Sequence, residues 1–297
     1  MADGINPTTN RFSTPYLTVT EFKNAPTAID IDNLVFNSID PDAQDAELAN
    51  VIARASSWID TYCNQILGAT NETETQRTRI RPDGTIRFHP RYNPVIALSN
   101  FQFGTDFTQM VTYPNCSLCW IENQEIIVPY AWSYMNYTSQ GPLQFGFPYS
   151  QWAEVFIQYT YVNGYANALI TSATAGQSSL VVDNPMGITA GLMMKIYDGF
   201  SSENVTVASN YTYGSTTVPL ILPLLYSHNA GTSISALPPA IKEAAILVTS
   251  AMLKVRGDRS MTMQVGTRPA EALPNTQNIS GDMSMAQDLL KPYRRIR

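Results

Sequence analysis

Two cysteines at a spacing typical of metal or redox pairs are the first candidates for chemistry in this sequence. Cys116 and Cys119 are separated by two residues. A zinc site would need a second Cys or His pair, and none follows. A reactive thiol would need a helix beginning at this point to lower its pKa, and none is expected there. We therefore expect reduced, partly buried thiols with no metal.

The two histidines, His89 and His228, are isolated from each other and from any motif. His89 lies between a predicted strand and a proline, which favours a surface side chain over a general base. The sequence contains no Gly-rich phosphate loop, nucleophile elbow or HExxH segment. We expect no catalytic residue and no cofactor, so the chain is predicted not to be an enzyme.

A group of acidic residues near the start lacks the glycine and the terminal glutamate of an EF-hand loop. A solvated face is the simpler interpretation, and no metal is expected there. The group consists of Asp30, Asp32, Asp40, Asp42 and Asp45.

Aromatic residues are abundant, with 16 Tyr, 11 Phe and 4 Trp, and many of them lie between Phe101 and Tyr165. In a sheet, such side chains most often form core or subunit contacts. The alternative is a platform of exposed rings on which sugars stack.

Composition describes a folded chain, because 44% of its 297 residues are hydrophobic and only 14% are charged. No apolar run approaches the roughly 18 residues that span a bilayer, so no membrane association is expected. The polar beginning lacks the basic and apolar regions of a signal peptide, and three cysteines cannot all pair with one another. These features predict a protein made and kept inside a cell.

Charge is unevenly distributed along the chain. The net charge of -6 disfavours general affinity for nucleic acid. Residues 1–66 carry 3 basic and 9 acidic side chains, whereas residues 237–297 carry 9 and 5. An acidic head and a basic tail favour head-to-tail contact between copies or docking of the tail on an acidic partner, although a merely solvated tail is equally compatible with this pattern.

The first long helix is predicted from about Asp42, with Asp42 or Asp45 capping its start and Gly68 just past its end. Apolar residues recur there at steps of three and four, and Val51 and Trp58 widen the stripe. The stripe consists of Leu48, Ile52, Ala55, Ile59, Tyr62 and Ile66. The preceding residues 1–40 read as an extended arm with one helical turn beginning at Thr20 and carrying Phe22.

Alternating residues predict strands over the next hundred positions. Pro82-Asp83-Gly84 suits a tight turn between strands at residues 77–81 and 86–89. Further strands are expected at residues 95–103, 120–128 and 155–162, and Asn163-Gly164 closes the last of them.

Residues 168–236 form a segment rich in Ser, Thr, Val, Gly and Asn, with one lysine and no arginine. We interpret it as a separate small antiparallel barrel or sandwich. Its strands are expected at residues 179–182, 193–197, 204–208 and 216–222, with a possible edge strand at 233–236.

A second helix is expected to begin at Leu237-Pro238-Pro239 and end at Arg256-Gly257. The predicted fold class is therefore α+β: a helical core with antiparallel strands, an inserted all-β module and extended termini. The expected domains are an N-terminal arm (1–40), a helix-plus-strand core (41–167 and 237–260), the inserted module (168–236) and an extended C-terminal tail (261–297).

The order of these pieces resembles the head-to-tail connector, or adaptor, proteins of long-tailed bacteriophages. The resemblance is carried by the helix Ala49–Cys63, a Pro-Val-Ile strand at 94–96, the strand Val155–Tyr165 and the Pro-led helix Leu237–Leu247. A terminal Leu-Leu-x-Pro-Tyr-Arg-Arg signature at Leu289–Arg295 is similar to the ending of larger actinobacteriophage versions. Residues 168–236 depart from the compact members, and they look like small β modules of phage neck and tail proteins.

The resemblance implies a structural virion protein of the phage neck, between capsid and tail, made in the host cytoplasm. It implies a twelve-subunit homo-oligomeric ring beneath the portal protein that extends the channel for genome ejection, contacts a downstream neck or tail-terminator protein, and lets DNA pass without specific binding. Val51, Trp58 and Tyr62 are the expected subunit-packing residues, since an apolar face wider than one stripe needs a second surface.

We expect the basic terminal segment to be an extended peptide that becomes ordered only on docking to portal or a neighbouring subunit. Its residues are Leu289, Leu290, Lys291, Pro292, Tyr293, Arg294, Arg295, Ile296 and Arg297. Three alternatives stay open: a carbohydrate-binding virion or surface protein that uses the aromatic-rich sheet or the β module, a hydrolase, and a different phage part such as a tail terminator or minor capsid protein.

Overall fold

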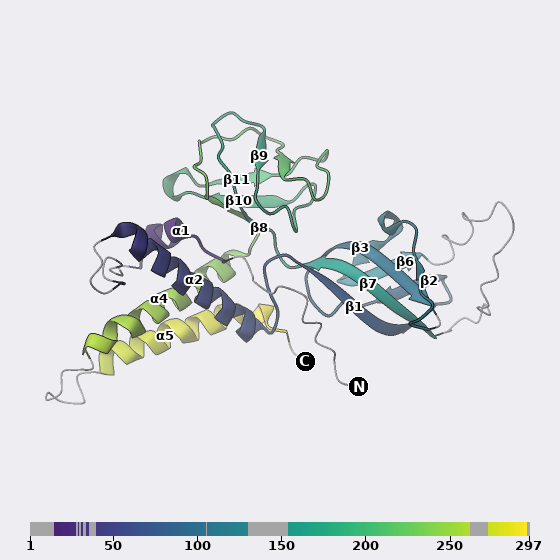
Figure 1. Ribbon diagram of the computed structural model, residues 1–297, viewed down its shortest axis with the longest axis horizontal. Helices are drawn as coiled ribbons and strands as arrows, with labels where there is room; N and C mark the ends of the chain where they lie inside the picture. The colour runs from purple at the N-terminus through teal and green to yellow at the C-terminus, as the bar shows by residue number, and fades with distance from the viewer. Residues whose placement is uncertain are drawn as a thin grey trace. The chain divides into compact units, whose positions relative to one another are not determined.

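The computed structural model (Figure 1) describes residues 15–27, 29, 31, 34–35, 40–104, 106–129, 154–261 and 273–295. The chain is mixed α+β, with antiparallel sheets and a few helices, as the sequence predicts. The described residues divide into two compact units, one made of residues 69–164 and the other of residues 15–68 and 165–295. Residues 1–14 of the predicted N-terminal arm, and several positions between 28 and 39, lie outside the described residues.

The first unit consists of two antiparallel sheets. One sheet has the order β1-β7-β3-β4 and the other the order β2-β6-β5. The strands are β1 Thr70–Arg79, β2 Thr85–Phe88, β3 Val95–Gly104, β4 Val111–Thr112, β5 Trp120–Glu122, β6 Glu125–Pro129 and β7 Glu154–Asn163, with a short 3-10 helix η1 at Cys116–Leu118. The predicted strands at 95–103 and 155–162 are confirmed.

Aromatic side chains fill the core of the first unit. Phe101, Tyr159 and Tyr161 are fully buried, and the Phe88 ring lies 4.4 Å from that of Tyr159. Every second side chain along β7 points inward, so the period of two places the Tyr159 and Tyr161 rings on one face of the sheet. These rings therefore serve as core, and they are not available as stacking platforms for sugars.

The turn at Pro82–Gly84 is confirmed, because Gly84 has a φ of 72° and its amide donates to the Arg81 carbonyl at 3.0 Å. The single strand predicted at 120–128 is wrong. Asn123 and Gln124 both adopt positive φ, 49° and 65°, and they turn the chain between β5 and β6. Two consecutive left-handed residues make the tight hairpin turn that matches strand twist.

Helices dominate one part of the second unit: α1 Val19–Asn24, α2 Pro41–Cys63, α4 Pro239–Met261, α5 Leu273–Leu290 and the 3-10 helix η3 Lys291–Tyr293. The predicted stripe of α2 is confirmed, since Leu48, Ile52, Ala55 and Ile59 are buried. They pack with residues of α1, α4 and α5 in one hydrophobic cluster, which we call the helical core.

Several predicted helix ends differ from the structure. Asp40, and neither Asp42 nor Asp45, caps α2, because Pro41 begins the helix and the Asp40 carboxylate accepts from the Asp42 amide. The helix ends at Asn64 in the left-handed conformation, before Gly68 is reached. The first turn begins at Val19, where Thr18 and Glu21 form a capping box.

The predicted end of the second helix at Arg256-Gly257 is wrong, because α4 continues to Met261. The extended C-terminal tail is also wrong, because α5 occupies Leu273–Leu290. Ala286 and Leu290 on α5 are buried in the helical core. Tertiary packing of these positions stabilises a helix that local sequence pattern does not indicate.

Residues 166–236, which we call the β8–β13 region, have a hydrophobic core of their own. Its strands are β8 Asn167–Leu169, β9 Ser179–Val181, β10 Met193–Tyr197, β11 Glu203–Thr206, β12 Thr217–Pro219 and β13 Ser233–Ser235, with a 3-10 helix η2 at Gly199–Ser201. They form sheets of order β11-β10-β13-β8 and β12-β9. All five predicted strand positions carry strands, whereas the three-residue β8 was not predicted.

A buried lysine joins the β8–β13 region to two helices. The Lys242 Nζ on α4 lies 2.7 Å from the Glu21 Oε1 on α1 and 3.3 Å from the Ser233 Oγ on β13. It also lies 4.3 Å from the ring centroid of Tyr197 on β10. Both charged side chains are only 6% exposed, so α1, α4 and two strands meet at one buried ion pair.

Replacing this lysine is expected to destabilise the second unit strongly. Lys242→Met should lower the free energy of unfolding by about 3–5 kcal/mol, because it leaves the Glu21 carboxylate buried without its cation. Glu21→Gln added to this variant should restore part of the loss. Lys23→Met, which removes an exposed partner of Asp45, is the matched control and should cost less than about 1 kcal/mol. Equal losses for the two lysines in urea denaturation would contradict this assignment.

Candidate functional site

Tyr165 and the terminal segment, both part of the family resemblance, meet at the C-terminal end of α2. The Tyr165 amide donates to the Leu67 carbonyl at 2.8 Å, and the rings of Tyr165 and Tyr293 meet edge-on at 6.5 Å. The Gln65 side chain donates to the Tyr293 carbonyl at 2.9 Å, and the Arg295 amide donates to the Cys63 carbonyl at 2.9 Å. The terminal segment is therefore bound to its own chain.

The nine residues predicted as a partner interface separate into buried and exposed groups. Leu290 is fully buried and Leu289 is partly buried, both in the helical core. Tyr293 and Arg295 are half-buried, whereas Lys291, Pro292 and Arg294 are exposed. Ile296 and Arg297 lie outside the described residues. The prediction that this segment becomes ordered only on docking is therefore wrong for residues 289–295, because Leu289 and Leu290 continue the packed face of α5.

The three predicted subunit-packing residues differ in how much of each side chain is exposed. Val51 is 1% exposed within the helical core, which leaves it no surface to offer a second copy. Trp58 and Tyr62 are half-buried, and their rings stack at 5.5 Å with an interplanar angle of 10°. The Tyr62 hydroxyl donates to the Gln287 carbonyl at 3.3 Å. Trp58 and Tyr62 therefore keep some exposed ring surface beside α5.

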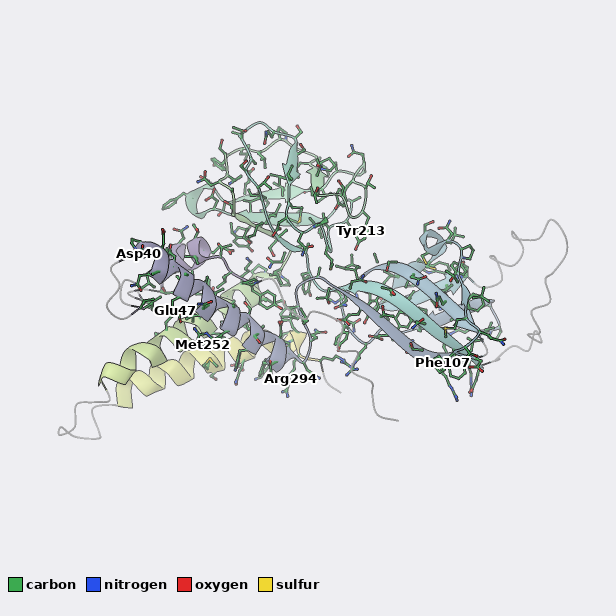
Figure 2. The ribbon with its side chains drawn as sticks, viewed as in Figure 1. Asp40, Glu47, Phe107, Tyr213, Met252 and Arg294 are labelled. Carbon is green, nitrogen blue, oxygen red and sulfur yellow. The ribbon has the colours of Figure 1, made fainter. Side chains whose placement is uncertain are left out.

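Cationic groups complete this end of the helical core. The Arg294 guanidinium lies 5.5 Å from the Tyr62 ring centroid, beside the C-terminal end of α2 (Figure 2). Lys291 is exposed and pairs with Asp288 at 2.7 Å. Cations near a helix C-terminus interact favourably with its partial negative charge. We call Trp58, Tyr62, Lys291, Pro292 and Arg294 the terminal surface; it combines exposed cations with two half-buried rings.

Cys116 and Cys119 are partly buried, as the sequence predicts. Cys116 and Cys119 are free and half-buried at the two ends of η1. Burial raises the pKa of Cys119 to about 12 and that of Cys116 above its ordinary value. Thiols that stay protonated are poor nucleophiles and poor metal ligands. Among the described residues, no group of three or more His, Cys, Asp or Glu side chains could hold a metal ion.

One histidine is not isolated, which corrects the prediction. His89 is exposed, with its Nε2 3.9 Å from the Glu125 Oε1. His228 is buried, with Nδ1 2.9 Å from the Asp198 Oδ2 and Nε2 2.9 Å from the Glu203 Oε1. Glu203 and Asp198 lie 25 and 30 positions before His228, and no sequence motif links residues at such separations. The only available signal was that residues 168–236 contain one histidine and three carboxylates.

In the first unit, the Glu74 carboxylate binds two buried tyrosine hydroxyls. The Tyr159 and Tyr161 hydroxyls donate to Glu74 at 2.8 and 2.6 Å, and the Arg91 amide donates to the same carboxylate at 3.0 Å. Burial, together with the Glu74 charge, raises the pKa of both phenols well above the ordinary range. Both stay protonated as donors, so this cluster is a structural network.

The acidic group near the start is only partly a solvated face. Asp40 caps α2 and Asp45 pairs with Lys23, whereas Asp42 is exposed. Asp30 and Asp32 lie outside the described residues.

Comparisons with known proteins identify no relative: no family model matches the chain, and no curated protein or solved structure matches it. Within the part of the chain that the structure describes, no helix combines the length and apolar character needed to cross a membrane.

Thiol labelling tests the burial of the cysteines. Burial raises the pKa of both Cys63 and Cys119 to about 12, so roughly one thiol in ten thousand is ionised at pH 8. Iodoacetamide should therefore alkylate both residues orders of magnitude more slowly in the native chain than in denaturant, as measured by peptide mass spectrometry. Rapid native labelling of Cys119 would show that η1 does not shield it.

Truncating the buried terminal leucine tests the packing of the terminal segment. Leu290→Ala should lower the free energy of unfolding by about 2–5 kcal/mol because it opens a cavity in the helical core. Met285→Ala on the exposed side of α5 is the matched control and should change stability by less than about 0.5 kcal/mol. Denaturation midpoints measure both changes. A negligible cost at Leu290 would mean that the segment does not pack as described.

Proposed function

We propose that this chain is a structural virion protein, a head-to-tail adaptor that forms a ring beneath the portal of a long-tailed bacteriophage and extends its DNA channel. The observation that carries the proposal is that the resemblance-bearing segments of the second unit share one hydrophobic cluster, whereas the strands at 94–96 and 155–164 belong to the first unit. Residues of α2, Tyr165, the start of α4 and residues 289–293 all contribute to the helical core. Segments far apart in the sequence would pack in this way if they form the common core of an adaptor.

The β8–β13 region fits the role of an inserted module. Its two ends are adjacent, since the Ala236 amide donates to the Ala166 carbonyl at 2.9 Å. A segment whose ends meet can be placed between two core elements without separating them. The hydrophobic cluster of the region is distinct from the helical core, as a folded insert requires.

The terminal surface is the proposed portal or neighbour contact. Leu290 is already buried in the helical core of its own subunit, so a partner would contact the cations and the partly exposed rings of this surface. Charge then selects a partner with an acidic face, and the acidic head of a neighbouring copy meets that requirement. The net acidic chain suits a conduit wall, because a surface that repels phosphates lets DNA pass without specific binding.

Carbohydrate binding is the second candidate, and exposed rings in the β8–β13 region favour it. Phe200, Tyr213 and Tyr226 are each exposed by 45% or more. Exposed rings can stack on sugars, although Phe101, Tyr159 and Tyr161 in the sheets of the first unit are buried. Reproducible hits on a glycan array that disappear in a Phe200→Ser variant would support this candidate over the adaptor.

Charge reversal on the terminal surface tests the adaptor proposal without disturbing the helical core. Lys291→Glu combined with Arg294→Glu should weaken attachment to portal by roughly tenfold or more, since like charges would face each other across the contact. Light-scattering mass measurement of the chain, alone and mixed with its portal, provides the readout. Arg79→Glu, an exposed arginine of the first unit, is the control and should attach normally.

Two outcomes contradict the proposal. Attachment of the doubly reversed variant at normal strength would reject the terminal surface as the portal contact. A wild-type chain that stays monomeric and never joins portal would reject the adaptor function itself and favour carbohydrate binding.

A further inference from the structure

Asp198, His228 and Glu203 form a cluster of titratable side chains in the β8–β13 region. Its imidazole side chain is fully buried, and each ring nitrogen lies 2.9 Å from a carboxylate oxygen. An ionised carboxylate only accepts hydrogen bonds, so a ring nitrogen that binds one must donate to it. The arrangement therefore places one imidazole between two carboxyl groups.

Glu203 extends this cluster to the backbone of a neighbouring segment. Its two carboxylate oxygens accept from the Leu225 amide at 2.9 Å and from the Tyr226 amide at 3.1 Å. Burial alone would raise the pKa of Glu203, but the Leu225 amide, His228 and the Tyr226 amide outweigh it and hold this pKa below its ordinary value. Folding thus favours the ionised form of Glu203.

The segment held by Glu203 presents an unusual number of exposed apolar side chains. Leu222 and Leu225 are 74% and 72% exposed, whereas Leu224 between them is buried in the core of the β8–β13 region. Phe200 is fully exposed on η2, between the two carboxylates of the cluster in sequence. We call Phe200, Ile221, Leu222, Leu225 and Tyr226 the apolar ridge. Contact with water does not stabilise exposed apolar side chains, so the backbone hydrogen bonds of this segment must keep it in the observed conformation.

We propose that Asp198, His228 and Glu203 form a charge latch that holds the apolar ridge in its exposed conformation only while the Glu203 carboxylate is ionised. Acidification places a proton on Glu203 and removes the acceptor charge that the Leu225 and Tyr226 amides share with the His228 ring. The two amides then lose their hydrogen bonds to a charged group, which frees the segment that carries the ridge.

Other charged groups near the latch are engaged elsewhere. Tyr197, next to Asp198 in the chain, carries Lys242 over its ring at 4.3 Å and Lys195 at 5.1 Å. Lys242 in turn pairs with Glu21. Asp198 and Glu203 contact the His228 ring, and Glu203 also accepts from the Leu225 and Tyr226 amides, so the protonation of Glu203 controls the latch. The latch does not depend on the adaptor proposal, since it concerns the β8–β13 region by itself.

Hydrogen exchange of the full chain as a function of pH tests the latch. After correction for intrinsic exchange rates, peptides covering Ile221–His228 should be protected near neutral pH. Protection should fall on the acid side, below the ordinary glutamate range, where Glu203 takes up a proton. His228→Gln should reduce protection at neutral pH by roughly tenfold or more, the expected effect of losing a hydrogen bond to a charged group. Glu203→Gln should remove the acid-side dependence, and it provides a second test if the histidine variant does not fold.

The only other histidine supplies the matched control. His89→Gln removes an exposed imidazole from the first unit and should leave the acid transition unchanged. Equal protection of Ile221–His228 across the pH range, or unchanged protection in His228→Gln, would overturn the latch. Loss of protection that coincides with loss in α2 and β7 would also overturn it, because the cluster would then report global unfolding and not local release.

Discussion

One buried ion pair constrains the second unit more than any single apolar contact. Lys242 is held by Glu21, Ser233 and the Tyr197 ring, so four elements share one cation. Burial lowers the pKa of Lys242 although Glu21 opposes the shift, which means that the pair does not fully recover the cost of desolvation. Its contribution is therefore to specify geometry: other arrangements of α1, α4 and β13 would leave a buried charge without a partner.

The end of β10 is where this constraint and the charge latch come together. Tyr197 lies under Lys242, and the next residue, Asp198, accepts from His228. Two consecutive residues thus join the buried Lys242 and His228 side chains to the same strand end. Glu21 extends the first contact into the capping box of α1, and Glu203 extends the second to the amides of Leu225 and Tyr226. Buried charge in the described part of this unit always ends on a hydrogen-bonded partner, which is how a low-dielectric interior tolerates it.

Sequence pattern predicted the elements that show a regular periodicity of apolar side chains. The three-and-four spacing of α2 and the bounds of β10 follow from side-chain periodicity, and both agree with the structure. Helix α5 does not show such a pattern, because Pro, Asn, Ser and Gly interrupt it and its order depends on Ala286 and Leu290 packing on other helices. The partners of His228 could not be found either, since loops bring Asp198 and Glu203 to it across 25 to 30 residues. Long-range pairing of this kind has no period to detect.

Burial of the terminal leucines changes what a partner can recognise. An extended apolar peptide would bind by inserting its side chains, but Leu290 already fills the helical core of its own subunit. The groups left on the terminal surface are two exposed cations, a proline and two half-buried rings. Exposed charges set orientation and association rate more than affinity, so a partner that binds tightly here must also cover the Trp58 and Tyr62 rings. Shape around these stacked rings, and not the basic sequence alone, would then decide which acidic surface can bind.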